Sequence, residues 1–188
     1  GPAHFERQSS LLGEVLGPGS EIARLFDSVV HPLMVVNLLR EVVFANRCAR
    51  ETLMPPDFDL ASQKRPGEAF RCGTAMSAPL GCGSGLQCQV CGMAGAILEA
   101  LDGRESAREC LVKRDTGPGL VVGVEARPTT IRGESFIVLS LTDLSHKKRR
   151  QALEHTFFHD VLNSANVIFA ASQVLAHEVG PDLQPLSR

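Results

Sequence analysis

Tyrosine and tryptophan are absent from this 188-residue sequence, so the aromatic part of any core must come from its nine phenylalanines. No apolar run approaches the roughly 20 residues that a membrane-spanning helix needs, and no secretory signal peptide is visible. Positive charge is not in excess: the net charge of −2 gives no reason to expect a nucleic-acid partner. These absences predict a cytoplasmic protein with neither a membrane nor a nucleic acid among its partners.

The composition that remains is ordinary for a globular protein, with 44% hydrophobic and 21% charged residues. The length suffices for one compact domain and an appendage. Gly1-Pro2 resembles the scar of a protease that removes a tag, so we expect the natural start to lie elsewhere. Residues 1–19 read as a weakly ordered lead-in that ends at the chain breakers "GPGS".

The order of predicted elements indicates an α+β domain. A short helix follows Ser20, and the Val-rich runs "PLMVVN" and "EVVFAN" are typical of a β-hairpin. Residues 47–90 hold one or two helical turns and then an irregular stretch, and "CGMAGAILEALDG" predicts a helix. Three strand-like runs follow, and one long helix is predicted over 145–179, ended by Gly180-Pro181. The fold class is therefore five antiparallel strands with helices inserted between the second and third, and a long C-terminal helix.

Two phrases in this order resemble PAS sensor domains. "VVFANRCARETL" is similar to the PAS second strand and the asparagine that follows it, here Asn46. "LTDLSHKKRRQAL" is similar to the D-[IL]-T motif that joins the last PAS strand to a signalling helix, with Asp143, Leu144 and Ser145 in its places and Ser where the family has Thr. The resemblance covers residues 20–145 and implies a PAS-like sensor domain there.

The long helix carries apolar residues on two stripes about a quarter turn apart. One stripe holds Leu153, Phe157, Val161, Ser164, Ile168, Ala171 and Leu175, and the other holds Phe158, Leu162, Ala165 and Phe169. A helix with two such stripes needs more than one neighbour, as in a four-helix bundle. We therefore expect residues 146–188 to mediate a homodimer through the C-terminal helix.

The phrase "HDVLN" on that helix resembles the phosphoacceptor box of sensor histidine kinases. The resemblance implies that His159 is the phosphorylated histidine, that Asp160 orients its ring and takes up its proton, and that Asn163 is linked to phosphatase activity. It also implies a response regulator as partner and ATP as a ligand of the full-length kinase. No Gly-rich phosphate loop is present, so this chain is expected to be inactive alone. The simpler alternative is a solvated histidine on a polar helix face.

Four cysteines follow the spacing C-x9-C-x5-C-x2-C: Cys72, Cys82, Cys88 and Cys91. In a reducing compartment, clustered cysteines favour metal or redox chemistry over structural disulfides. Neighbouring glycines let backbone N–H groups approach the sulfurs, and Cys91 opens a predicted helix whose N-terminus stabilises a thiolate. We predict an iron–sulfur cluster on these four thiols. Zinc, a metal-free thiol–disulfide switch and buried cysteines without a role remain open, because the spacing matches no common ferredoxin or zinc-ribbon pattern.

Two further cysteines, Cys48 and Cys110, are predicted to be small buried hydrophobes. The basic run from His146 to Gln151 is predicted to be the solvated start of the long helix. The functional hypothesis is a sensory fragment of a two-component histidine kinase that detects oxygen or redox state through a cysteine-bound cofactor and controls autophosphorylation of His159. The alternative is a zinc-braced PAS module for dimerisation or protein interaction.

Overall fold

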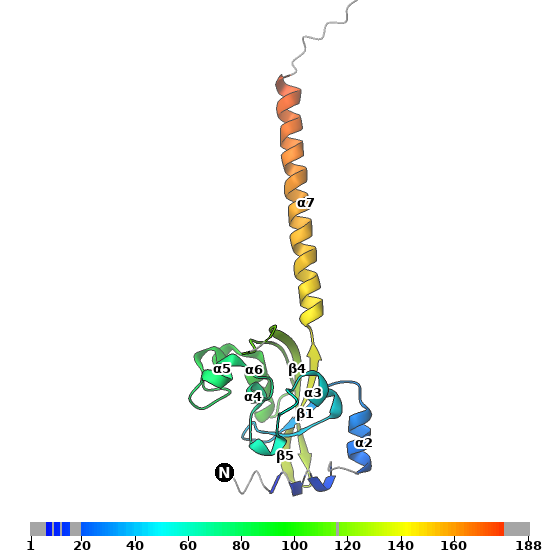
Figure 1. Cartoon of the computed structure of the whole chain (residues 1–188), viewed down its shortest axis with the longest axis vertical. Helices are drawn as coiled ribbons and strands as arrows, with labels where there is room; N and C mark the ends of the chain where they lie inside the picture. Colours follow the sequence, from blue (N-terminus) through cyan, green and yellow to red (C-terminus); the bar gives the residue numbers. More distant parts are fainter. Residues whose placement is uncertain (1–6, 9, 12, 16–19, 116, 179–188) are drawn as a thin grey trace, which may run out of the picture. The chain divides into compact units, whose positions relative to one another are not determined.

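A computed structural model describes residues 7–8, 10–11, 13–15, 20–115 and 117–178. Five antiparallel strands form one sheet in the order β2-β1-β5-β4-β3 (Figure 1). Their bounds are Leu33–Val36 (β1), Val42–Ala45 (β2), Ser106–Val112 (β3), Leu120–Ile131 (β4) and Glu134–Asp143 (β5). The predicted hairpin is β1–β2, and β5 lies between β1 and β4.

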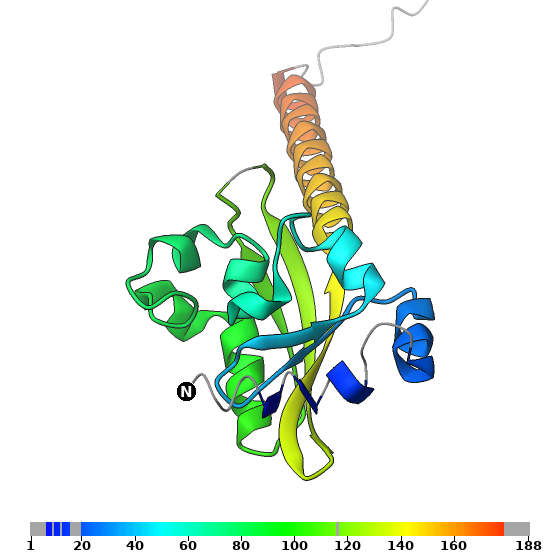
Figure 2. The same cartoon turned by 60° about the horizontal axis from the view of Figure 1, so that its bottom comes forward.

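The helices between β2 and β3 are α3 (Arg47–Thr52), α4 (Pro66–Ala69), α5 (Gly73–Ser77) and α6 (Gly92–Leu101), with short 3-10 turns at Leu60–Ser62 (η1) and Leu86–Val90 (η2). Helix α2 (Glu21–Ser28) precedes the sheet, and Ser20 caps it by accepting a hydrogen bond from the Ala23 amide. Figure 2 shows α4, α5 and α6 grouped beside one face of the sheet. The predicted fold class, a PAS-like five-stranded antiparallel sheet with inserted helices and a long C-terminal helix, is confirmed.

The main core lies between α6 and the sheet. Helix α6 buries Met93, Ala96 and Ile97 against β3 and β4. Strand β4 buries alternate residues, as a strand with one covered face must: Leu120, Val122, Val124 and Ala126. Phenylalanine supplies the aromatic part, as the absence of Tyr and Trp requires, with Phe70 in this core and Phe136 in a smaller cluster on β1, β2 and β5.

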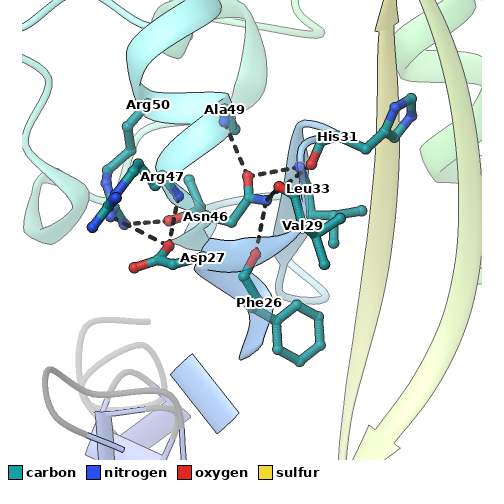
Figure 3. Close-up of polar contacts among 10 residues, drawn as sticks. Phe26, Asp27, Val29, His31, Leu33, Asn46, Arg47, Ala49 and Arg50 are labelled. Atoms are coloured by element: carbon teal, nitrogen blue, oxygen red, sulfur yellow. Dashed lines mark hydrogen bonds and ion pairs between the residues drawn. The ribbon is translucent and has the colours of Figure 1, made fainter. Parts of the chain in front are cut away.

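Asn46 ties four elements together (Figure 3). Its side chain is fully buried, between β2 and α3. The side-chain oxygen accepts hydrogen bonds from the amides of Leu33 at 2.9 Å and Ala49 at 3.0 Å, so it caps α3 and holds the start of β1. The side-chain amide donates to the carbonyl oxygen of Phe26 in α2 and to those of Val29 and His31 on the segment that joins α2 to β1. One buried amide therefore bonds to backbone groups of α2, α3, the start of β1 and the segment between α2 and β1.

Hydrogen bonds of Asp143 and Ser145 stabilise the junction between β5 and the C-terminal helix. The Asp143 carboxylate accepts a hydrogen bond from the Ser145 amide at 2.8 Å. The buried Ser145 hydroxyl accepts one from the Val121 amide of β4 at 2.9 Å, and the Leu144 amide donates to the Val121 carbonyl at 2.7 Å. The serine that stands where PAS domains have threonine thus bonds to the neighbouring strand through its hydroxyl.

Helix α7 (Ser145–Glu178) is the predicted long helix. Its residues from His146 onward form a compact unit of their own, and the preceding residues form another. The predicted stop at Gly180-Pro181 and much of the 1–19 lead-in lie outside the described residues. Within those residues, no helix combines the length and apolarity that a bilayer crossing requires.

We predict that Asn46→Ala destabilises the domain by about 3 kcal/mol, because it leaves several buried backbone groups without partners. Asn163→Ala on exposed α7 is the matched control and should change the free energy of unfolding by less than about 0.5 kcal/mol. Urea unfolding followed by circular dichroism measures both. An Asn46→Ala value within the range of the control would show that water replaces these bonds without cost.

Candidate functional site: a thiol cluster and an exposed histidine

Backbone hydrogen bonds join the cysteine-rich segment to the residues that follow β3. Cys72 and Arg114 form an antiparallel bridge, and the Gly73 amide donates to the Lys113 carbonyl at 2.7 Å. The Asp115 amide donates a hydrogen bond to the Arg71 carbonyl at 3.1 Å. Cys72, which is 19 residues from Cys91 in sequence, is therefore held at the end of β3, the strand against which α6 packs.

At Gly92, the first turn of α6 comes very close to the backbone of β3. A Cβ at position 92 would lie 1.9 Å from the carbonyl oxygen of Glu109, which no real side chain tolerates. Glycine permits this close approach. This close approach also brings the neighbouring residue, Cys91, onto β3. The Sγ atom of Cys91, the N-cap of α6, lies 3.4 Å from the Sγ atom of Cys110 on β3.

These two thiols shift each other's pKa in opposite directions. The hydrogen bond from Cys110 lowers the pKa of Cys91, and the backbone amides of Met93 and Ala94 in the first turn of α6 lower it further, against the effect of burial. The same contact and the burial of Cys110 raise the pKa of that thiol. Cys91 is therefore the thiolate of the pair and Cys110 the donor.

Cys82 lies in a different environment. Its sulfur is 2.7 Å from the position that a Cβ on Gly67 would occupy, and its amide donates to the Glu68 carboxylate at 2.7 Å. Burial raises the pKa of Cys82 to about 12, with smaller contributions from the charges of Glu68, Cys91 and Cys88. At neutral pH this thiol keeps its proton.

A cavity of about 390 Å³ lies where the segment meets β3. Four thiols line it: Cys72, Cys88, Cys91 and Cys110. The structure thus brings together three of the four predicted ligands and adds Cys110, while Cys82 does not line this cavity. Across the part of the chain that the structure describes, no three His, Cys, Asp or Glu side chains are gathered in metal-binding geometry.

Cys48 and Cys110 had been predicted to be small buried hydrophobes. Cys48 is half-buried on α3, and Cys110 is 4% exposed within the core. What the sequence did not reveal is the contact between Cys110 and Cys91, because it depends on how α6 packs across β3. The glycine directly after Cys91 was the available signal, since it marks a close backbone approach.

The second candidate site is on α7. Residues one turn apart share a helix face, and this spacing brings Asn163 to His159. The Asn163 amide nitrogen lies 3.2 Å from Nδ1 and 3.3 Å from Nε2 of His159, and an Asp160 carboxylate oxygen lies 3.3 Å from Nδ1. The His159 side chain is 64% exposed, and Asp160 and Asn163 contact its ring nitrogens.

Large apolar side chains on α7 are exposed in the single chain, as the two predicted stripes require. They include Leu153, Phe157, Phe158, Val161, Leu162, Ile168 and Phe169. The rings of Phe157 and Phe158 touch edge to face, with centroids 5.8 Å apart. Leu175 of the predicted stripe lies outside the described side chains.

No sequence-family profile matches this chain, and no curated protein does. Several solved structures similar to it are PAS domains. That of Bordetella pertussis BvgS is 19% identical over 76% of this chain and 95% of its own, with a TM-score of 0.47. A PAS domain from Desulfitobacterium hafniense is 11% identical over 64% and 99%, with a TM-score of 0.46. The PAS domain of nitrogen regulation protein NR(II) from Vibrio parahaemolyticus is 12% identical over 66% and 98%, with a TM-score of 0.44.

We predict that Cys91 reacts with iodoacetamide with a pH midpoint below the value of about 8.5 typical of a free cysteine. In the reduced, metal-free chain, peptide mass spectrometry at each pH measures the reaction at every cysteine. Cys82 should stay unreactive to pH 9, because its pKa is about 12. The ionised Cys91 stabilises the fold fully above its unfolded pKa, and this contribution is lost as the pH falls through the lower folded value.

Cys110→Ala is the informative variant for this titration, since it removes the largest cause of the shift. The Cys91 midpoint should rise in that variant, whereas Cys48→Ala should leave it unchanged. A wild-type midpoint at or above that of free cysteine would contradict the assignment of Cys91 as the thiolate.

Proposed function

We propose that this chain is the sensory part of a two-component histidine kinase, in which a PAS-like domain detects oxygen or redox state at its thiol-lined cavity and controls phosphorylation of His159. The observation that carries the proposal is a row of paired residues across the sheet. Cys110 of the cavity pairs with Val122, and Val122 pairs with Asp143. Asp143 is the residue whose carboxylate holds the start of the signalling helix.

The chemistry of the cavity supports a cofactor bound by sulfur. Thiolates are the ligands that iron–sulfur clusters and zinc prefer, and four thiols share this cavity. Of the four sequence-predicted ligands, Cys72, Cys88 and Cys91 line this cavity and Cys82 does not, and we propose an iron–sulfur cluster as the resident group. Bound there, it would supply a centre that oxygen and oxidants alter. The protein's part would be to hold the thiols and to stabilise negative charge with amides such as those of Met93 and Ala94.

The neighbours of His159 support a phosphoacceptor role. Phosphoryl transfer needs a free lone pair on Nε2, and a proton on Nδ1, which lies 3.3 Å from an Asp160 carboxylate oxygen, would leave that lone pair free. Nε2 attacks the terminal phosphorus of ATP, the bond from that phosphorus to the bridging oxygen breaks, and ADP leaves. Asp160 takes up the Nδ1 proton. The ATP has to be presented by a kinase domain, for which this sequence supplies no phosphate-binding loop.

The signal path in this proposal is short. A change in the thiol cluster shifts the first turn of α6 against β3, and the paired strands β3, β4 and β5 carry that shift to Asp143 and Ser145. These residues set the start of α7, on which His159 lies 14 residues further on. The exposed apolar stripes of α7 would pair with those of a second copy in a homodimer, and a response regulator would receive the phosphoryl group.

A second candidate is a zinc-braced PAS module that mediates protein interaction and senses nothing. The Cys91–Cys110 separation of 3.4 Å favours it, because two sulfurs on one tetrahedral zinc lie about 3.8 Å apart when each Zn–S bond is about 2.3 Å. Zinc would then lock α6 to β3 and would undergo no redox change.

In a longer chain that carries the kinase domain, we predict that His159→Gln abolishes incorporation of phosphate from ATP. His155→Gln is the matched control, because His155 is an exposed histidine one turn earlier on the same helix, and it should retain activity within about twofold. Incorporation that persists in His159→Gln would refute the phosphoacceptor role, whatever the cavity binds.

For the cofactor, we predict iron and acid-labile sulfide in chain purified without oxygen, with visible absorption that air bleaches. Elemental analysis and absorption spectra before and after exposure to air measure this. Cys88→Ala should lower the iron content at least several-fold, and Cys48→Ala should leave it unchanged. A colourless protein with one zinc per chain would replace the redox proposal by the zinc brace.

A further inference from the structure

The contact between Cys91 and Cys110 carries an inference that the cofactor proposal does not contain. We infer that, in the cofactor-free chain, Cys91 and Cys110 form a reversible intramolecular disulfide that ties the start of α6 to the middle of β3. Their sulfur atoms lie 3.4 Å apart. Among the residues that the structure describes, they are the two thiols in direct contact with each other.

The backbone around the pair is already close enough for a disulfide bond. Gly92 abuts the Glu109 carbonyl so tightly that no side chain fits between them, so the segments that bear the two thiols are packed together. Disulfides require such neighbouring backbones, and the sulfur atoms here need to approach by only about 1.4 Å to reach a bond length of about 2.05 Å.

The other thiols are less suited to react with this pair. Cys82 is enclosed between Gly67 and Glu68, away from the cavity lining. Cys72 and Cys88 line the same cavity, and each belongs to a different turn of the inserted segment. Cys110 is 4% exposed, whereas Cys91 is half-buried and lines the cavity, so an oxidant from solvent reaches Cys91 first.

The reaction is oxidation by a peroxide. The Cys91 thiolate attacks one oxygen of hydrogen peroxide, the O–O bond breaks, and the hydroxide that leaves takes a proton to become water. Cys91 is now a sulfenic acid. The Cys110 sulfur displaces its hydroxyl, the S–S bond forms, and the hydroxyl leaves with the Cys110 proton as a second water. The two thiols lose two electrons and the peroxide gains them. A dithiol reductant reverses the change.

The disulfide acts at a point with a defined connection to the signalling helix. Cys110 is in register with Val122, which is in register with Asp143. A covalent link between Cys91 and Cys110 holds α6 against this row. It also removes Cys91 from any cofactor, so the disulfide and a cluster that uses Cys91 exclude each other. The inference itself does not depend on the proposed function, because it concerns the cofactor-free chain.

Peptide mapping tests the inference. The chain is reduced, freed of metal with a chelator, treated with hydrogen peroxide, blocked with N-ethylmaleimide and digested with trypsin. Cleavage after Arg71, Arg104, Arg108 and Lys113 places four cysteines on residues 72–104 and Cys110 on residues 109–113. We expect these two peptides joined, two hydrogen masses lighter than their sum, with maleimide on Cys72, Cys82 and Cys88. Dithiothreitol should separate them.

Variants give the matched controls. Cys110→Ala should lose the joined peptide and leave Cys91 as a sulfenic acid that dimedone traps, whereas Cys48→Ala should form the joined peptide as the wild type does. Wild-type chain in which Cys110 is blocked by maleimide after peroxide treatment, or in which Cys91 is joined to a different cysteine, would overturn the inference. Because the wild-type result decides the question, poor folding of a variant does not affect it.

Discussion

The close approach of α6 to β3 at Gly92 is the constraint on which the candidate sensor site depends. Because residue 92 has no side chain, the first turn of the helix lies directly on the backbone of Glu109. Its two neighbours then have fixed roles: Met93 enters the core, and Cys91 faces Cys110. The contact that closes the hydrophobic core is thus the same contact that places two thiols together. Any event that changes the distance between them must strain or relax the packing of α6.

The two sides of the sheet differ in how they are held. On the β1–β2 side, the buried side-chain amide of Asn46 makes five hydrogen bonds. They join α2, α3 and the start of β1 and stabilise their arrangement. On the β3–β4 side, the links to α7 pass through Val121 and Ser145 near the end of β5. In the proposed mechanism, a shift at the thiols would reach this junction across about two strand spacings, or roughly 10 Å.

Much of this fold could be predicted from the sequence because its signals are local. The hairpin, the cap at Ser20, the helix after Cys91 and the long helix each follow from residue types within one segment. The surroundings of Cys82 and Cys110 could not be predicted from local residue types. The sequence predicted a ligand at Cys82, which lies beside Gly67, and a buried hydrophobe at Cys110, which is buried as predicted but also contacts Cys91. Which thiols meet depends on tertiary packing, which spacing along the chain does not specify.

The position of Cys91 gives one thiolate two incompatible fates. As a ligand of the proposed cofactor it would need its negative charge, which the amides of the first turn of α6 favour. When no cofactor is bound, the same charge makes it the nucleophile that an oxidant meets, with Cys110 beside it to complete a disulfide. A chain that had lost the proposed cofactor would then not keep a reactive thiolate at Cys91. Both fates hold α6 at β3, but they do so through different atoms, and the row from Cys110 to Asp143 is where that difference would reach the signalling helix.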